Sequence, residues 1–160
     1  MSLESNTGGS AALKFVDDII EILDDGWIPR IGGTKPEFVK AWEFKESGLT
    51  GKYAICIVHL DDEAIRIFSM MQGNPLDHTQ FAYDWLHEVS VTLELRTGDS
   101  QRRILQMTDM VTYILKNNVV PVVNNRQYVQ ILPDGYVPMN EEYRNLYKTM
   151  VSCTAQRFNP

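Results

Sequence analysis

The chain has 160 residues, of which 44% are hydrophobic and 22% charged, so it can bury a core and suits a single domain. Its net charge of −6 argues against a surface built to wrap nucleic acid, because affinity for phosphates comes from Lys and Arg. No apolar run approaches the ~20 residues of a membrane span. The two cysteines, Cys56 and Cys153, lie in apolar runs, which is typical of buried thiols in a reducing compartment rather than of a disulfide or metal pair.

The N-terminal part predicts a flexible tail, an amphipathic helix and a short strand. Residues 1–10 are polar and contain glycine, without the charged and apolar regions of a signal peptide. From Ser10 to Asp25 apolar residues recur at helical spacing, with Ser10 as N-cap and Gly26 just past the end. We interpret the carboxylates of this helix as a solvated face and not as a metal or acid-base cluster; they are Asp17, Asp18, Glu21, Asp24 and Asp25. A glycine-containing loop then leads to a strand over residues 36–44, whose common face holds Phe38, Trp42 and Phe44.

The next two segments predict a central strand followed by an insertion. Residues Tyr53 to Leu60 are apolar on both faces, which is typical of a strand covered on both sides of the sheet. From Asp61 to Gln80 the pattern degrades, so we expect an insertion or hairpin tip between two strands. This segment is longer than the connections that compact domains usually use, which favours a functional or assembly role.

The stretch from Phe81 to Thr97 predicts a strand of unusual length. Its odd positions are mostly apolar or aromatic and its even positions mostly polar, a period of two that indicates a strand with one buried face. At ~3.3 Å per residue this strand would span roughly 55 Å. A domain of this chain length has a diameter on the order of 40 Å. The strand therefore either bends near His87 or projects as an arm, and we expect a projecting arm to reach a neighbouring subunit.

The C-terminal part predicts a second helix and two more strands. A turn at Gly98–Ser100 caps a helix over residues 101–117, which places one apolar face inward and Arg102, Arg103 and Lys116 on its outer side. The inward residues are Ile104, Met107, Val111, Ile114 and Leu115. A strand over 128–132 is expected to close at a Pro133-Asp134-Gly135 turn. The last strand lies within residues 141–158, with Tyr147, Val151, Cys153 and Ala155 on one face.

This order of elements predicts an α+β fold with one mixed, mostly antiparallel sheet, two helices packed on one face and a long projecting β-hairpin. Residues 11–160 form one domain after the flexible tail 1–10, with the insertion at about 61–85. No repeat, low-complexity tract or linker divides the chain.

The sequence contains no spacing that signals a catalytic, cofactor or metal site. The three histidines, His59, His78 and His87, lack metal-ligand spacing, and no nucleophile elbow or phosphate-binding loop is present. His59 beside the acidic run 61–63 could form a hard-metal site, but we favour a strand-end turn rich in carboxylates, and we expect His87 to be a hydrogen-bonded interior or interface residue. Glu94-Leu95-Arg96 resembles the Glu-x-Lys pair of some nucleases, but Arg is a poor general base. We therefore expect no enzyme, cofactor or metal, with a small metal-dependent nuclease or other α+β enzyme as the alternative.

Aromatic and apolar residues in and after the insertion predict a protein interface. Tyr and Trp are favoured at interfaces because they bury much area while keeping a polar group. The predicted interface residues are Ile65, Ile67, Phe68, Met70, Met71, Phe81, Tyr83 and Trp85. The alternative is that this segment folds back over its own core.

The chain from Leu13 to Phe158 resembles the tail terminator, or tail completion, proteins of long-tailed bacteriophages and archaeal tailed viruses. The resemblance lies in a helix ending at Asp25-Gly26-Trp27, a short strand after Lys35-Pro36 and the apolar strand Tyr53 to Leu60. It continues in a strand His87 to Thr97 that ends in Arg-Thr and runs into the helix 101–117, followed by a strand and then a last strand over 143–157. The insertion from Asp61 to Gln80 has no counterpart in the family pattern.

The resemblance implies a structural protein of the virion that forms a ring, typically of six copies, at the head-proximal end of the tail. Such a ring caps the tail tube, stops its polymerisation and joins the tail to the neck or connector protein, after assembly in the host cytoplasm. It implies that the partners are other copies of the chain, the tail tube protein and a neck protein, with DNA only as passing cargo and no membrane. Another head-tail connector or adaptor protein is the alternative within this class.

Overall fold

The computed structural model describes residues 11–46, 49, 51–71, 82–124, 126–128, 130–139 and 146–158. Its helices are α2 (Ala11–Gly26), the short α3 (Pro29–Gly32) and α4 (Gln101–Asn117), with a 3₁₀ turn η1 (Ala41–Glu43). Its strands are β1 (Glu37–Lys40), β2 (Ala54–Met71), β3 (Ala82–Thr97), β4 (Val122–Val123), β5 (Arg126–Gln127), β6 (Gln130–Pro138) and β7 (Tyr147–Phe158). In this part of the chain, no helix combines the length and the apolar character that a membrane crossing demands.

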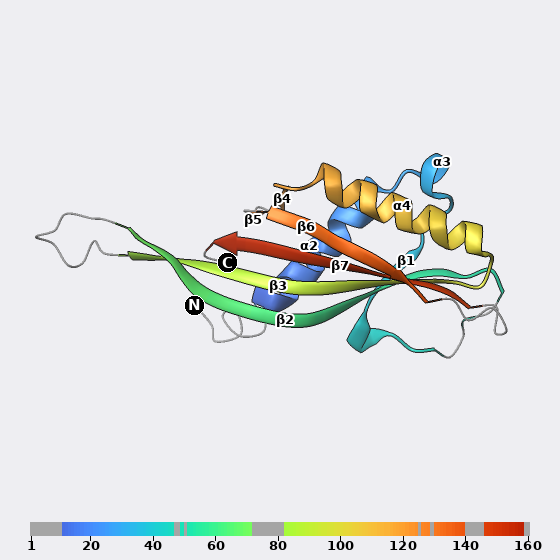
Figure 1. Cartoon of the computed structure of the whole chain (residues 1–160), viewed down its shortest axis with the longest axis horizontal. Helices are drawn as coiled ribbons and strands as arrows, with labels where there is room; N and C mark the ends of the chain where they lie inside the picture. The colour runs from blue at the N-terminus through green and yellow to red at the C-terminus, as the bar shows by residue number, and fades with distance from the viewer. Residues whose placement is uncertain are drawn as a thin grey trace, which may run out of the picture.

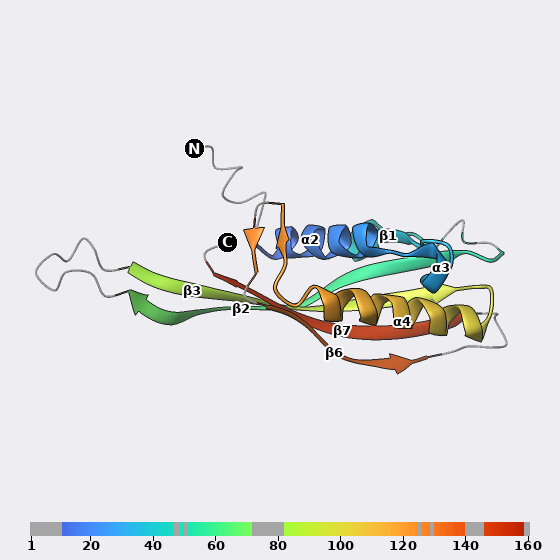
Figure 2. The ribbon, with the colours of Figure 1, turned by 90° about the horizontal axis from the view of Figure 1, so that it is seen from above.

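Five strands form one mixed sheet in the order β1-β2-β3-β7-β6. β1 runs parallel to β2, and the other neighbouring pairs of this sheet are antiparallel. Helix α2 contacts β1, β2 and β3, whereas α4 contacts β3, β7 and β6, so the two helices share one face of the sheet (Figures 1 and 2). This arrangement confirms the predicted α+β architecture, including the hairpin of β2 and β3 that projects from the body.

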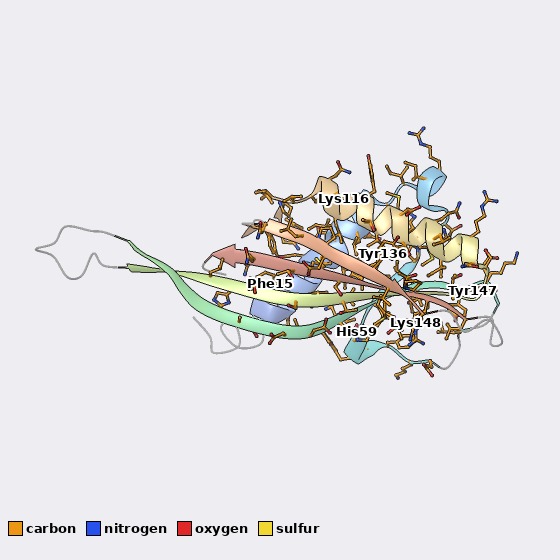
Figure 3. The ribbon with its side chains drawn as sticks, viewed as in Figure 1. Phe15, His59, Lys116, Tyr136, Tyr147 and Lys148 are labelled. Carbon is orange, nitrogen blue, oxygen red and sulfur yellow. The ribbon has the colours of Figure 1, made fainter. Side chains whose placement is uncertain are left out.

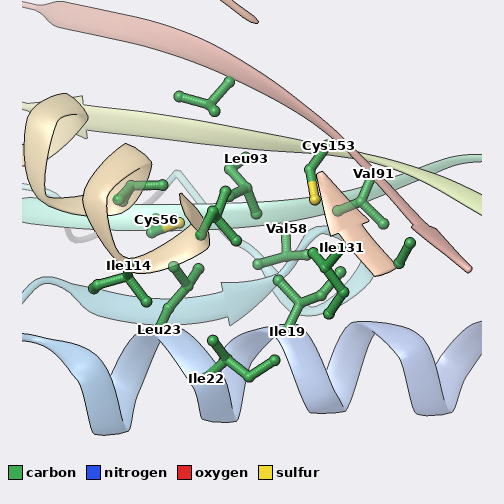
Figure 4. Packing of buried hydrophobic residues seen from close by; sticks show 14 of the residues in the cluster. Ile19, Ile22, Leu23, Cys56, Val58, Val91, Leu93, Ile114, Ile131 and Cys153 are labelled. Atoms are coloured by element: carbon green, nitrogen blue, oxygen red, sulfur yellow. The ribbon is translucent and has the colours of Figure 1, made fainter. Parts of the chain in front are cut away.

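The core lies between these two helices and the sheet (Figure 4). The inward residues predicted for the second helix are all buried, and so are Ile19 and Leu23 of α2. The odd positions of β3 also reach this core from Val89 to Leu95, as its period of two predicts. Ser100 caps α4 by accepting a hydrogen bond of 3.1 Å from the Arg103 backbone N–H, which confirms the predicted start of that helix.

β2 is covered on both faces where the sequence predicts it. Cys56 and Val58 belong to the core beneath the helices, while Ile55 and Ile57 are equally buried on the opposite face, because successive side chains of a strand alternate. The turn η1 contacts β2, and Phe44, which follows it, packs under Arg96, the partner of Ile55 on this opposite face. Residues 54–58 therefore form an interior strand, paired with β3 as expected, with Ile57 opposite Glu94.

The segment from Asp61, expected to be an insertion or hairpin tip, begins as a continuation of β2, which runs to Met71. The pairing with β3 shifts register between Leu60 and Asp62 and again between Ile67 and Ser69. Each such bulge adds a residue to one strand and breaks the alternation of faces. The sequence pattern degrades here for that reason, although the hydrogen-bonded pairing continues.

Two shorter predictions also need correction. β1 ends at Lys40 and η1 follows, so Phe38, Trp42 and Phe44 do not share one strand face, and Trp42 is exposed. Pro133-Asp134-Gly135 does not close a hairpin: β6 continues to Pro138, and its register against β7 shifts between Pro133 and Gly135. The turn-forming residues therefore accommodate a bulge inside a strand.

Arg103 is buried and does not lie on the outer side of α4, where the sequence places it. Its guanidinium donates hydrogen bonds to the backbone carbonyls of Gly32 and Thr34. A side chain at Gly33, whose φ is +75°, would collide with this guanidinium. Arg103 therefore holds the segment after α3 against α4.

Candidate assembly surface

β2 and β3 extend beyond the rest of the sheet as a two-stranded arm. Within the described residues, the pairing of β7 with β3 reaches only as far as Leu86, and that of β1 with β2 only as far as Val58. Residues 67–71 and 82–85, which we call the arm, pair only with each other in this part of the chain, from Ile67 opposite Trp85 to Met71 opposite Ala82. The arm points away from the body in Figures 1 and 2, at the left of both views.

Most of the predicted interface residues belong to this arm. The backbone places Ile67, Phe68, Met70, Met71, Tyr83 and Trp85 in it, and Ile65 pairs with His87 at its base. Phe81 lies outside the described residues, and so do the side chains of the other seven. Their role as an interface stays a prediction, now attached to a segment whose backbone projects from the domain.

The arm has open strand edges on both sides. From His59 onward β2 has no neighbour on its β1 side among the described residues, and β3 has none on its β7 side from Ala82 to Trp85. Neither stretch contains proline, so the outward N–H groups are available. Open edges of this kind readily pair with another chain.

The part of β2 and β3 that leads into the arm, residues 61–66 and 86–90, is what we call its base, and its β2 strand is acidic. Asp61, Asp62 and Glu63 are exposed, and Asp61 is the extra residue of the first bulge, where it accepts a hydrogen bond from the Thr92 hydroxyl. The backbone N–H of Glu63 donates to the Asp62 carboxylate at 2.8 Å. The interpretation of these acids as a strand-end turn is wrong, because they lie within β2. Among the described residues, no group of three His, Cys, Asp or Glu side chains is arranged to hold a metal ion.

His59 contacts Glu94 instead of the acidic run, on the sheet face away from the helices (Figure 3). Its Nε2 lies 3.1 Å from Glu94 Oε1, and Arg96 Nε donates to Glu94 Oε2. Arg96 also bonds Glu46 at 3.1 Å and lies over the Phe44 ring at 5.3 Å. Burial opposes a charged Arg96, but its bonds to the two carboxylates prevail and raise its pKa. Both oxygens of Glu94 are thus engaged, which is unlike a carboxylate poised as a general base.

A second group of charges is buried beside the base of the arm. Arg157, at the end of β7, pairs in register with His87, and its guanidinium lies 3.9 Å from Asp18 on α2. The guanidinium also lies over the rings of Phe15 and Tyr128, at 5.2 and 5.7 Å. Asp18 accepts further bonds from the Tyr128 hydroxyl and, at 2.7 Å, from the amide of Asn124. The cluster links α2 and β7 to the segment after α4. It does so beside His87, close to the base of the arm.

Sequence reasoning missed this cluster because it assigned Asp18 to the solvated face of its helix. Asp18 is fully buried. The available signal is its position three residues after Phe15 and directly before Ile19, both on the inward face. The buried partner Arg157 is almost the whole chain away, so no local pattern predicts the pair.

The end of β6, at the edge of the sheet away from β1, exposes three apolar side chains. Tyr136, Val137 and Met139, at the end of β6, are 56%, 60% and 49% exposed, and we call these three residues the β6 patch. Figure 3 shows Tyr136 on this strand. These residues are not predicted from the sequence, because Pro133-Asp134-Gly135 predicts a turn just before them.

Comparisons with known proteins find a similarity of fold. No family model matches the chain, and no curated protein matches it. Among solved structures, the fold is similar to that of a chain from the virion of a native gene transfer agent particle. The TM-score is 0.52 with 12% sequence identity, and the match covers 94% of this chain and 100% of the other. At this identity the similarity is one of fold.

Proposed function

We propose that this chain is a structural virion protein that forms a ring at the head-proximal end of a tail. In this role it caps the tail tube, stops its polymerisation and joins the tail to a neck or connector protein. The resemblance of its sequence to tail terminators supports the proposal, and so does the similarity of its fold to a chain of a virion particle. The observation that carries it is the arm.

The arm needs a partner for physical reasons. A two-stranded hairpin is marginally stable in water on its own. This one is built from an apolar sequence, with Ile67, Phe68, Met70, Met71, Tyr83 and Trp85 in its paired strands. Its open edges and this composition are both satisfied when the arm packs on another chain. Neighbouring copies in a ring, or the tail tube, supply that chain.

The charge distribution fits a channel for passing DNA. The net charge is −6, and three of the exposed carboxylates lie at the base of the arm. A ring of such subunits repels phosphates and lets DNA slide without gripping it.

Electron microscopy of the purified protein, and of tails assembled with and without it, tests the proposal. We expect closed rings from the protein alone, and tails of uncontrolled length when it is absent. Metal-dependent cleavage of DNA by the purified chain, lost in Glu94→Gln, would contradict the proposal and support a nuclease.

A further inference from the structure

We propose that the β6 patch receives the arm of a second copy, so that copies join head to tail through side-chain contacts. The proposal rests on the proposed ring and names the two surfaces that meet within it. The sheet has two edges: β1 and the arm strand β2 lie toward one, and β6 forms the other. We call them the β2 side and the β6 side.

The outer edge of β6 is closed to strand pairing. The Ile131 N–H points away from β7 and donates to the Val119 carbonyl at 2.7 Å, so the nitrogen of Pro133, two residues later, faces outward too. The Met139 N–H donates to Lys148 on the β7 side at 2.8 Å, so the nitrogen of Pro138 also faces outward. Two of the outward positions therefore carry proline, which has no N–H to offer. A partner on this side must bind through side chains.

The β6 patch offers suitable side chains. Its three residues are each about half exposed or more at the end of an outermost strand; Tyr136 shares the face of its partner Val151, toward the helices, and Val137 shares the opposite face with Met150. An edge strand that exposes apolar side chains on both faces offers a surface for a partner. The arm is the segment with matching apolar composition, and it leaves the domain on the opposite side of the sheet.

Charge favours joining unlike sides over joining like sides. The β2 side exposes Asp61, Asp62 and Glu63, so two such sides placed face to face would repel. On the other side, α4 packs against β6 and exposes Asp109 as well as Arg102 and Lys116. β6 exposes Asp134, so this side carries both signs of charge and repels an acidic partner less. When the acidic base of one copy's arm meets the β6 side of the next copy, the contact is head to tail. Repeated contacts of this kind generate a ring when the rotation from copy to copy closes.

Sedimentation velocity over a concentration series tests the pairing with three single variants. We expect Val137→Ser, in the patch, and Trp85→Ser, in the arm, each to raise the dissociation constant of self-association by about 10-fold or more, since an interface anchor commonly contributes that much. The control is Ile31→Ser on α3, because Ile31 is similarly exposed, at 47%, and lies outside both surfaces. It is expected to associate like the wild type.

Mixing the patch variant with the arm variant gives the sharper result. One intact arm and one intact patch remain in the mixture, so we expect heterodimers to form at concentrations where each variant alone is monomeric. If Trp85→Ser blocks association but Val137→Ser does not, the arm binds elsewhere, and the inference is overturned while the ring stands. A wild-type chain that stays monomeric at every concentration overturns the inference and the ring together.

Discussion

Asp18 is a buried carboxylate whose partners come from distant parts of the chain. It lies 3.9 Å from the Arg157 guanidinium and accepts hydrogen bonds from Tyr128 and Asn124. Removing one member of a buried ion pair leaves the other charge in a low-dielectric site, which commonly costs about 3–5 kcal/mol. Replacing Asp18 is therefore expected to lower the free energy of unfolding more than replacing any neighbouring acid on α2.

We predict that Asp18→Ala lowers the free energy of unfolding by about 3–5 kcal/mol. The matched control is Asp17→Ala, one residue earlier, where a half-exposed carboxylate pairs with Lys40 at 2.7 Å. Surface pairs of this kind contribute about 0–1 kcal/mol. Urea unfolding followed by tryptophan fluorescence measures both. Equal losses for the two variants would show that the buried cluster adds no stability beyond a surface pair.

His87 makes stability depend on pH at the base of the arm. Burial lowers its pKa below the ordinary 6.5, Glu63 on β2 opposes this shift, and Arg157 on β7 adds to it. Its Nδ1 is buried without a hydrogen-bond partner among the described residues, so the hydrogen bond expected from the sequence is not made through this atom. The unfolded chain therefore takes up a proton at a pH where the folded chain does not.

We predict that His87 contributes stability above pH 6.5 that is lost as the pH falls below this value. Melting temperatures of the wild type and His87→Gln, measured at about pH 7.5 and about pH 5.5, separate this effect from the titration of other groups. The wild type should lose more stability on acidification than the variant. A difference between the two proteins that stays constant with pH would contradict the assignment.

Among the elements, β3 could be predicted from the sequence and the second half of β2 could not. β3 has no register shift against β7, so its alternation survives over the whole pairing, and the same is true of the face of β7 from Val151 to Ala155. β2 and β6 contain bulges, and in both the sequence pattern fails where the register shifts. Local periodicity is informative only where each strand contributes one residue per pair.

The candidate surface was predicted in part. The length of β3 and its apolar sequence neighbours indicated a projecting arm, and the backbone follows that expectation. Which edges stay open depends on where β1 and β7 end, at Lys40 and Phe158. The pairings of β1 and β7 join segments that are distant in the sequence, so no local pattern predicts them. The β6 patch was missed for the same reason, since Pro133-Asp134-Gly135 is a turn by local preference and a bulge by its pairing with β7.

The interior of the sheet provides a prediction at the scale of the element. Leu93 packs beneath the helices, and Ile57 is buried on the opposite face. We predict that Leu93→Ala and Ile57→Ala each lower the free energy of unfolding by about 2–5 kcal/mol, the usual loss for a buried aliphatic side chain. Chemical denaturation measures both changes. An unchanged melting temperature for Ile57→Ala would mean that the second face of β2 is not covered in solution.

For the whole molecule, the body and the arm differ in how their strands are supported. The body has a sheet with two helices on one face and a buried cluster at its end, whereas the arm is two strands that pair with each other among the described residues. Stability is not uniform across such a structure, and segments with few packed neighbours open at low free energy. The arm is thus expected to be ordered by assembly and not by the domain itself.

Hydrogen exchange of the free monomer and of assembled rings or tails tests that expectation. We predict fast exchange of backbone amides from Ile65 to Trp85 in a verified monomer and strong protection after assembly, because packing against another chain raises the free energy of opening the hairpin. The strands of the body, such as 54–58 and 89–95, serve as internal controls and should be protected in both states. Strong protection of the arm in the monomer would mean that it packs on its own domain, and the interface would then lie elsewhere.

Single substitutions in the arm complete this test. Trp85→Ala and Tyr83→Ala should leave the melting temperature of the monomer unchanged. Both residues precede the part of β3 that pairs with β7, which starts at Leu86. Each should nevertheless weaken ring formation, because truncating a buried aromatic anchor commonly costs about 2 kcal/mol or more at an interface. The paired measurement of monomer melting and ring formation separates an assembly role from a folding role. A fall in the melting temperature as large as that of Leu93→Ala, with ring formation lost in proportion to folding, would assign these aromatic residues to the core of their own domain.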